Sequence, residues 1–248
     1  MRIKVLGCEV MYREICYAAA RSPHTTSVQF LPRGLHDGGS AGMRARLQNE
    51  IDSAEAARYD AVVLGYALCG NGTVGLVARG APLVIPRAHD CITLLMGSRH
   101  AFETYFDTHP GVYYRSTGWL ERGTDIVQLK QTGSQQRNGA GYELDELIAQ
   151  YGEDNGRYLY EQLGGYRQSY TTLTFIETGI EPNGTFEQQA EAEARSRGWR
   201  YEKLAGSMRW FEAMLAGDWA EEDFLVVPPG YRTVACFDSR LIDVEKAS

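Results

Sequence analysis

The run DAVVLGYALC, residues 60–69, decides the fold class, because its apolar residues follow one another with no alternation of polar ones. A strand of this composition is covered on both faces, which is typical of parallel sheets packed between helices. The run PLVIPR, residues 82–87, has the same character. Together the two runs predict buried strands of one parallel sheet.

Amphipathic segments with the 3.6-residue period of a helix alternate with short apolar runs in the first half of the chain. The expected strands cover residues 3–8, 27–32, 60–69 and 82–87. The expected helices cover residues 11–21, 43–58, 74–78 and 91–107. This alternation predicts an α/β fold with an open, mostly parallel, Rossmann-like sheet.

A segment rich in glutamine, glycine and serine, QLKQTGSQQRNGAG at residues 128–141, interrupts this alternation. The pattern then resumes, with expected helices over residues 143–163, 188–197 and 208–215, and expected strands over residues 171–179, around 201, and over 223–230 and 233–242. We therefore expect an α/β domain over residues 1–122 that carries the functional site, and a second, smaller α/β unit over residues 123–248.

Composition narrows the class of protein. The formal net charge of -7, with no block of basic residues, argues against a nucleic-acid partner. The sequence contains no apolar run of membrane-spanning length and no signal-peptide pattern, so we expect a cytoplasmic protein that does not enter a membrane. Five cysteines in 248 residues do not indicate a secreted disulfide scaffold. We expect reduced thiols, available as ligands or nucleophiles.

Metal-capable side chains follow four successive predicted strands. Ligands in open α/β sheets bind outside the carboxyl ends of the strands, so these side chains are expected to meet at one edge. Thiolate and imidazole groups favour zinc, and a catalytic zinc keeps one position open. The predicted metal ligands are Cys8, Cys69, Cys91 and His36. His89 is an alternative for the fourth position.

Three alternatives to zinc stay open. Three cysteines from separate loops can hold a [4Fe–4S] cluster with one open iron. Cys91, at the start of a predicted helix and close to His89, could instead be a nucleophilic thiol. Finally, the cysteines could be core residues without chemistry, which is the expected role of Cys16 and Cys236.

The remaining predicted site residues surround these cysteines. His89 and Asp90 precede Cys91 directly, and Glu177 ends a predicted strand of the second half, so these three are the candidate catalytic residues. The stretch CGNGTVG, residues 69–75, contains a GxGxxG pattern, but the acidic residue expected of a dinucleotide site is missing. Its backbone, at the start of a predicted helix, could hold an anion. The predicted cofactor-binding residues are Gly70, Asn71, Gly72 and Arg87.

Several longer motifs resemble one family. GCEVMYREIC, LPRGLHD, LGYALCGNG, IPRAHDCITLLMGSR, GWLE, FIETG and FLVVPPG are similar to the bacterial and archaeal family catalogued as domain of unknown function 1638. The family pattern has YGLCGNG where this chain has Ala67 in place of the first glycine. The resemblance implies an association with corrinoid-dependent methyltransferase systems of one-carbon metabolism. It names no substrate.

The leading hypothesis is a metal-dependent enzyme that acts on a small molecule with an anionic end, by methyl transfer or by hydrolysis. Methyl-group chemistry is implied only by the resemblance. The second hypothesis is a non-catalytic metal- or ligand-binding accessory protein for a corrinoid methyltransferase partner. A nicotinamide or flavin oxidoreductase is the third, based on the glycine pattern alone. A homodimer is the expected assembly, because it is the commonest one.

Overall fold

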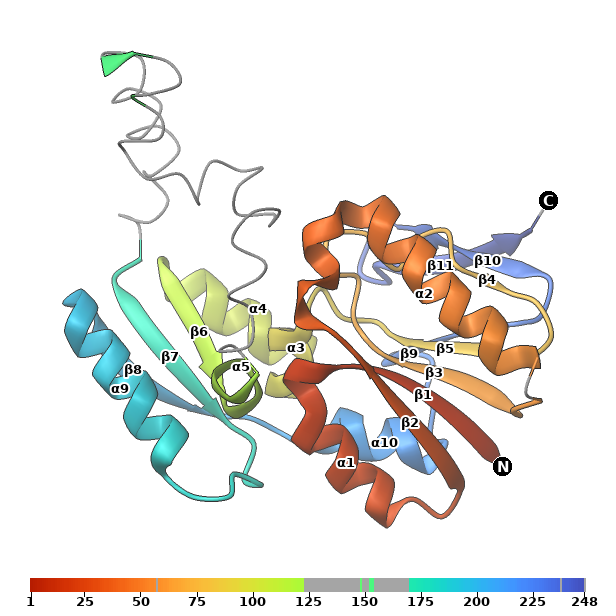
Figure 1. Cartoon of the computed structure of the whole chain (residues 1–248), viewed down its shortest axis with the longest axis horizontal. Coiled ribbons are helices and arrows are strands. Elements are labelled where there is room, and N and C mark those ends of the chain that lie inside the picture. The colour runs from red at the N-terminus through yellow and green to blue at the C-terminus, as the bar shows by residue number, and fades with distance from the viewer. Residues whose placement is uncertain (57, 123–147, 149–151, 154–169, 237, 248) are drawn as a thin grey trace.

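The computed structural model describes residues 1–56, 58–122, 148, 152–153, 170–236 and 238–247 (Figure 1). The predicted helix over residues 143–163 and the predicted connection at 128–141 lie almost entirely outside these residues. In the described part of the chain, no helix has the length and apolar character that a membrane crossing requires.

Five strands form the main sheet, in the order β2-β1-β3-β5-β9. The first four are parallel and β9 runs antiparallel to β5. All residues of β3 and β5 are buried, as their unbroken apolar sequence predicts. The strands are β1 Arg2–Cys8, β2 Thr25–Leu31, β3 Ala61–Gly65, β5 Leu83–Pro86 and β9 Phe224–Val227. This arrangement confirms the predicted α/β fold with a mostly parallel sheet.

Helices cover both faces of the main sheet (Figure 1). Helix α2 lies over one face, and α1 and α10 pack together on the other. Short helical turns, η1 and η2, precede α1 and α2. The bounds are η1 Glu9–Met11, α1 Tyr12–Arg21, η2 Arg33–Gly38, α2 Gly39–Ala56 and α10 Arg209–Ala216.

A second sheet and a third sheet complete the fold. The second sheet is parallel, in the order β6-β7-β8, and lies between α9 on one side and α4 on the other (Figure 1). Its elements are β6 Val112–Ser116, β7 Thr172–Glu177, β8 Arg200–Ala205, α3 Cys91–Met96, α4 Arg99–Thr108, α5 Thr117–Glu121 and α9 Thr185–Arg197. The third sheet contains β4 Val77–Ala78, β10 Tyr231–Ala235 and β11 Ile242–Lys246.

Two predicted helices are wrong in detail. The chain forms turns over residues 70–75 and then enters β4, so no helix covers residues 74–78. The predicted helix over residues 91–107 is two helices, α3 and α4. Gly97 ends α3 with φ of 72°, and the Ser98 side chain caps α4 by accepting a hydrogen bond from Ala101 N.

Sheet membership does not follow the predicted boundary at residues 122 and 123. Strand β6, before that boundary, pairs with β7 of the second sheet, and β9, far beyond it, pairs with β5 of the main sheet. The C-terminal half therefore contributes a strand and helix α10 to the first unit. The division into two domains at this position stays a prediction.

The two sheets meet where α5 packs against η1. Gly118 of α5 lies so close to the main chain of η1 that a Cβ atom there would be 1.7 Å from Val10 O. The Arg13 guanidinium donates two hydrogen bonds to the Glu121 carboxylate, at 2.9 and 2.8 Å. The corner between β6 and α5 is thereby fixed against the end of β1.

A buried carboxyl group lies at the same junction. Glu14 of α1 is 1% exposed, and its Oε1 lies 3.1 Å from Thr178 Oγ1, which is also 3.1 Å from Glu181 Oε1. A hydroxyl has one hydrogen, so it cannot donate to both carboxylates. The Glu181 carboxylate also accepts two backbone N–H groups, at 2.7 and 2.8 Å. The Thr178 hydroxyl therefore donates to only one of the two carboxyl groups at a time, and burial raises the pKa of Glu14 to about 7.

Replacing Gly118 with alanine is expected to destabilise the protein, because the new methyl group meets backbone rather than a flexible side chain. We expect Gly118→Ala to lower the free energy of unfolding by about 1–3 kcal/mol in urea titrations. Gly42→Ala is the matched control, since a Cβ atom there has nothing within 4 Å. Equal midpoints for Gly118→Ala and wild type would contradict the close packing of α5 on η1.

Glu14 is expected to make stability depend on pH. The pKa of Glu14 is raised from 4.5 to about 7, so the folded state holds the proton more tightly than the unfolded state. Stability is therefore highest below the unfolded value and falls as pH rises through about 7, by up to about 3 kcal/mol. Urea titrations at pH 5 and pH 8 measure this, and Glu14→Gln should abolish most of the difference. Glu212→Gln, at an exposed position of α10, should retain it.

Candidate functional site

Three neighbouring parallel strands each lead to a cysteine at the same edge of the main sheet. Cys8 is the last residue of β1, Cys69 lies four residues beyond β3, and Cys91 lies five residues beyond β5. The chain leaves β1 toward β2 and later returns to form β3 on the other side of β1. This edge therefore holds the change of strand order at which open α/β proteins bind ligands.

Backbone pairing continues beyond β3 and β5, and it fixes Cys69 relative to the residues that precede Cys91. Leu68 N donates to Ala88 O at 3.0 Å, and Cys69 N donates to His89 O at 2.9 Å. Cys69 is consequently held beside the residues that lead into Cys91.

The turn that carries Cys69 has an uncommon backbone conformation. Cys69, Gly70 and Asn71 have φ angles of 48°, 66° and 66°, all in the left-handed region. This region costs a residue with a side chain roughly 1–2 kcal/mol. Such conformations persist where the surrounding structure imposes them, and they cluster at functional sites.

The three thiols are close enough to influence one another. Burial is the main cause that raises the pKa of each thiol, to about 11 for Cys8. The charge of Cys8 further raises the pKa of Cys69, and both raise the pKa of Cys91. A thiol with a raised pKa is neutral near pH 7 and is a weak nucleophile. This environment is the opposite of the one that an activated Cys91 nucleophile requires.

The main sheet supplies two polar groups around Cys8. Tyr66 is fully buried, and its hydroxyl lies 3.5 Å from Leu31 O and makes a hydrogen bond with the Cys8 thiol. Arg33, at the start of η2, lies near Cys8 and lowers its pKa, against the larger effect of burial. Glu9 Oε1 accepts a hydrogen bond from Arg33 N at 2.8 Å and holds this turn in place.

The corner between β6 and α5 supplies the opposite side of the site. The Trp119 ring lies beneath the Arg33 guanidinium, 4.8 Å from ring centre to Cζ, and its indole N–H faces Cys91 closely enough to oppose the rise in the pKa of that thiol. Burial, the neighbouring Tyr105 and the Asp90 carboxylate raise the pKa of Tyr114 to about 12. The sequence gives no signal for Tyr114, because the pairing of its strand is not visible there.

Asp90 and His89 have different places at this edge. Asp90 Oδ1 caps α3, accepting hydrogen bonds from Thr93 N at 3.0 Å and from Thr93 Oγ1 at 3.1 Å. His89 is held through its backbone carbonyl, and its side chain is exposed. Both residues lie beside the thiols, while their predicted catalytic roles stay predictions.

Two of the predicted cofactor-binding residues, Arg87 and Gly72, make contacts within the protein itself. Arg87 is 5% exposed, and its guanidinium donates to the carbonyl groups of Glu221, Arg240 and Ile242 in the C-terminal part of the chain. A Cβ atom on Gly72 would lie 2.2 Å from Met43 Sδ, so this glycine is required for packing against α2.

The expectation that the Gly70 to Gly72 turn presents amides at a helix start is wrong, because no helix follows the turn. Instead, Gly72 N donates to Cys69 O at 3.4 Å, Val74 N to Asn71 O at 3.2 Å, and Gly75 N to Thr233 O at 2.9 Å. Gly70 and Asn71 themselves remain exposed beside Cys69. Their predicted contact with a cofactor or substrate stays a prediction.

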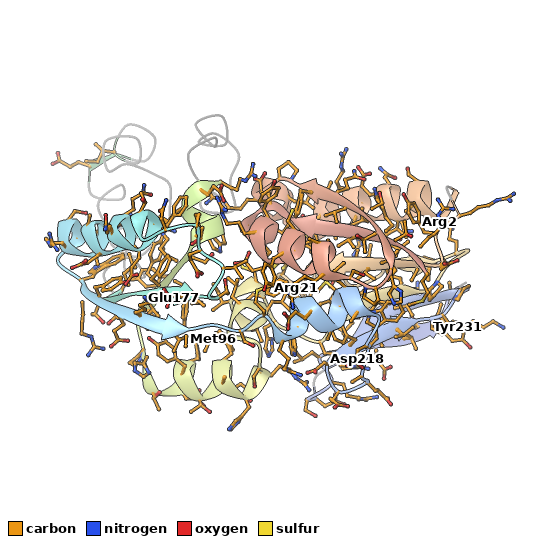
Figure 2. The ribbon with its side chains drawn as sticks, turned by 90° about the horizontal axis from the view of Figure 1, so that it is seen from below. Arg2, Arg21, Met96, Glu177, Asp218 and Tyr231 are labelled. Carbon is orange, nitrogen blue, oxygen red and sulfur yellow. The ribbon has the colours of Figure 1, made fainter. Side chains whose placement is uncertain are left out.

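Glu177 lies at the end of β7 in the second sheet, where Figure 2 labels it. Its carboxylate pairs with Lys203 Nζ at 2.7 Å, and its side chain is 39% exposed. Met96, at the end of α3, lies between this unit and the main sheet in the same view (Figure 2). The structure thus gives Glu177 a partner within its own unit.

Within the described residues, no group of three or more His, Cys, Asp or Glu side chains is arranged to hold a metal ion. His36 lies on η2, and its side chain is outside the described part of the chain, so its role as a ligand stays a prediction. The three cysteines lie at one edge of the sheet, and zinc binding by them stays a prediction. Three cysteines from three different strands are nevertheless a donor set that suits an iron–sulfur cluster.

Comparison with known proteins agrees with the motifs of the sequence. The model of the family described as "Protein of unknown function (DUF1638)" matches residues 30–215, from the end of β2 to α10. The comparisons with curated proteins and with solved structures found no match. The family match covers well over half of the chain. The chain therefore belongs to the DUF1638 family.

Proposed function

We propose that this protein is a metalloenzyme whose Cys8, Cys69 and Cys91 bind an iron–sulfur cluster of the [4Fe–4S] type with one iron open to a small-molecule substrate. The observation that carries the proposal is the meeting of three thiols from three adjacent parallel strands at the change of strand order. The left-handed conformation of Cys69 supports it, because a strained turn with a cysteine at its tip is costly to keep for packing alone.

The origin of the three ligands on separate strands favours a cluster over a single ion. A zinc site needs its ligands converged on one point at about 2.0–2.3 Å from the metal. In a cluster, each thiolate binds a different iron, so ligands on three separate strands need not converge. The open iron would supply Lewis-acid chemistry to a substrate oxygen, nitrogen or sulfur atom when bound.

The chain's own residues would position the substrate and exclude water. Tyr66 lies beside Cys8, to which it keeps a hydrogen bond, and Trp119 lies beside Cys91. His89 is exposed at the entrance and is the group best placed to exchange protons with solvent. The protein would work in the cytoplasm, where thiols stay reduced.

Metal analysis tests this proposal most directly. Protein purified without air and without a metal-affinity tag should contain about four iron atoms per chain and show a brown iron–sulfur absorption. Cys69→Ala and Cys91→Ala should lose most of the iron and the colour. Cys16→Ala and Cys236→Ala are matched controls, since both cysteines are half-buried and lie on other elements, and they should keep both.

The other outcomes distinguish the alternatives. Colourless protein with about one zinc per chain, lost in Cys69→Ala, would replace the cluster by the predicted zinc site. Stoichiometric metal without turnover of any small molecule, but required by a methyltransferase in a reconstituted reaction, would favour the accessory protein. No metal, together with unchanged properties of Cys69→Ala and Cys91→Ala, would overturn the proposal.

A further inference from the structure

Buried polar groups without partners are concentrated on one short segment. Among the described residues, six side chains have a buried polar atom without a hydrogen-bond partner. Glu14 and Thr73 lie elsewhere, and the other four lie between β6 and the residue after α5: Tyr114, Thr117, Trp119 and Arg122. Leaving such a group unpaired costs about 1–3 kcal/mol. A segment that carries several of them is therefore suited to a ligand that supplies the missing partners.

The Trp119 indole N–H is the clearest of these groups. It is a donor only, it is buried, and the sulfur it faces is a weak acceptor. The indole N–H groups of Trp210 and Trp219, in contrast, donate to Asp223 Oδ1 at 2.9 Å and to Met214 O at 3.0 Å. Trp119 thus lacks an oxygen acceptor that other tryptophans of this chain have.

Tyr114 and Thr117 add hydroxyl groups on the same corner. Side chains alternate along β6, and Arg115 points to α9, where it binds Glu193 at 2.8 and 2.9 Å. Tyr114 therefore points the other way, toward Tyr105 of α4 and toward Asp90 at the start of α3. Thr117 is 2% exposed, and its Oγ1 has no partner.

Arg33 brings a positive charge to this corner. Its guanidinium lies over the Trp119 ring at 4.8 Å and acts on Cys8 at the same time. Asp90, the nearby negative group, has Oδ1 engaged in capping α3. The groups around the corner are then an indole N–H, two hydroxyl groups that can donate, and the guanidinium groups of Arg33 and Arg122, a combination that recognises an oxyanion.

We propose that Trp119, Thr117, Tyr114 and Arg33 form an oxyanion-binding subsite, which takes the carboxylate or phosphate end of the small molecule that reaches the thiols. This inference deepens the proposed function and rests on it for the role of the ligand as a substrate. The binding itself does not need the metal. The anion site is thereby proposed at the corner between β6 and α5, and not at the turn over Gly70 to Gly72, where the sequence predicted it.

Nuclear magnetic resonance of the tryptophan indole groups tests the subsite. Full-length protein labelled with ¹⁵N-tryptophan is titrated with acetate and, separately, with inorganic phosphate, and the Trp119 signal is assigned with Trp119→Phe. We expect a saturable shift of the Trp119 signal, with the Trp210 and Trp219 signals unmoved because their N–H groups already have acceptors. A shift with acetate alone identifies a carboxylate, and a shift with phosphate identifies a phosphate ester.

Variants separate the subsite from nonspecific anion binding. Arg33→Gln should weaken binding roughly tenfold, as expected for the loss of a charge-assisted hydrogen bond. Thr117→Val, which keeps the shape of the side chain, should weaken it less. Arg195→Gln, on an exposed arginine of α9, is the matched control and should leave the affinity unchanged.

The same titration on Cys69→Ala separates this proposal from the previous one. A Trp119 shift in this variant, whatever its metal content, supports the subsite even if the metal proposal fails. No saturable shift with either anion, in wild type and in Cys69→Ala, overturns the subsite, and would mean that ordered water satisfies these groups. Equal weakening by Arg33→Gln and Arg195→Gln would also overturn it, since binding would then follow net charge alone.

Discussion

The parallel pairing of β1, β3 and β5 is the constraint on which the rest of the site depends. Each strand packs against other elements on both faces, so a slip of one strand by one residue would disrupt the close packing of its side chains. This fixed register determines where each strand ends and therefore where Cys8, Cys69 and Cys91 can lie. The pairing of Leu68 with Ala88 and of Cys69 with His89 extends the same register beyond the strands. It reaches the turn that contains Cys69 and the residues that lead to Cys91.

Sequence patterns predicted the main sheet well because its strands are continuous apolar runs and its helices are amphipathic. They failed at residues 74–78, where an apolar run of helical spacing is a turn and a short strand held by Thr233 from the far end of the chain. Contacts of this kind between distant segments leave no periodic signal. The patterns also joined α3 and α4, where the break is local: Gly97 ends α3 in the left-handed conformation and Ser98 caps α4. These two residues are signals of a helix end and a helix start that periodicity alone overlooks.

The candidate site was predictable in part for the same reason. The three cysteines follow strands that the sequence identifies, so the rule for carboxyl ends of parallel strands brings them together. Arg87 and the glycine turn look like ligand-binding groups in the sequence. In the structure, Arg87 donates hydrogen bonds to backbone carbonyl groups, and the Met43 side chain packs closely against Gly72. The sequence shows which residue types follow a strand, but it does not show which of them packing has already engaged.

The second sheet approaches the site where α5 packs closely on η1. Gly118 lets α5 approach the backbone of η1, and that approach brings Trp119 next to both Cys91 and Arg33. The thiols come from the main sheet and the unpaired donors come from the second, so neither sheet alone holds a complete set of groups. A ligand that binds both sides would add its own contacts to those that already join the sheets, among them the Arg13 to Glu121 pair and the Thr178 hydroxyl beside Glu14. Binding of such a ligand and the docking of the two sheets would therefore be coupled, because each sheet supplies groups that the ligand needs.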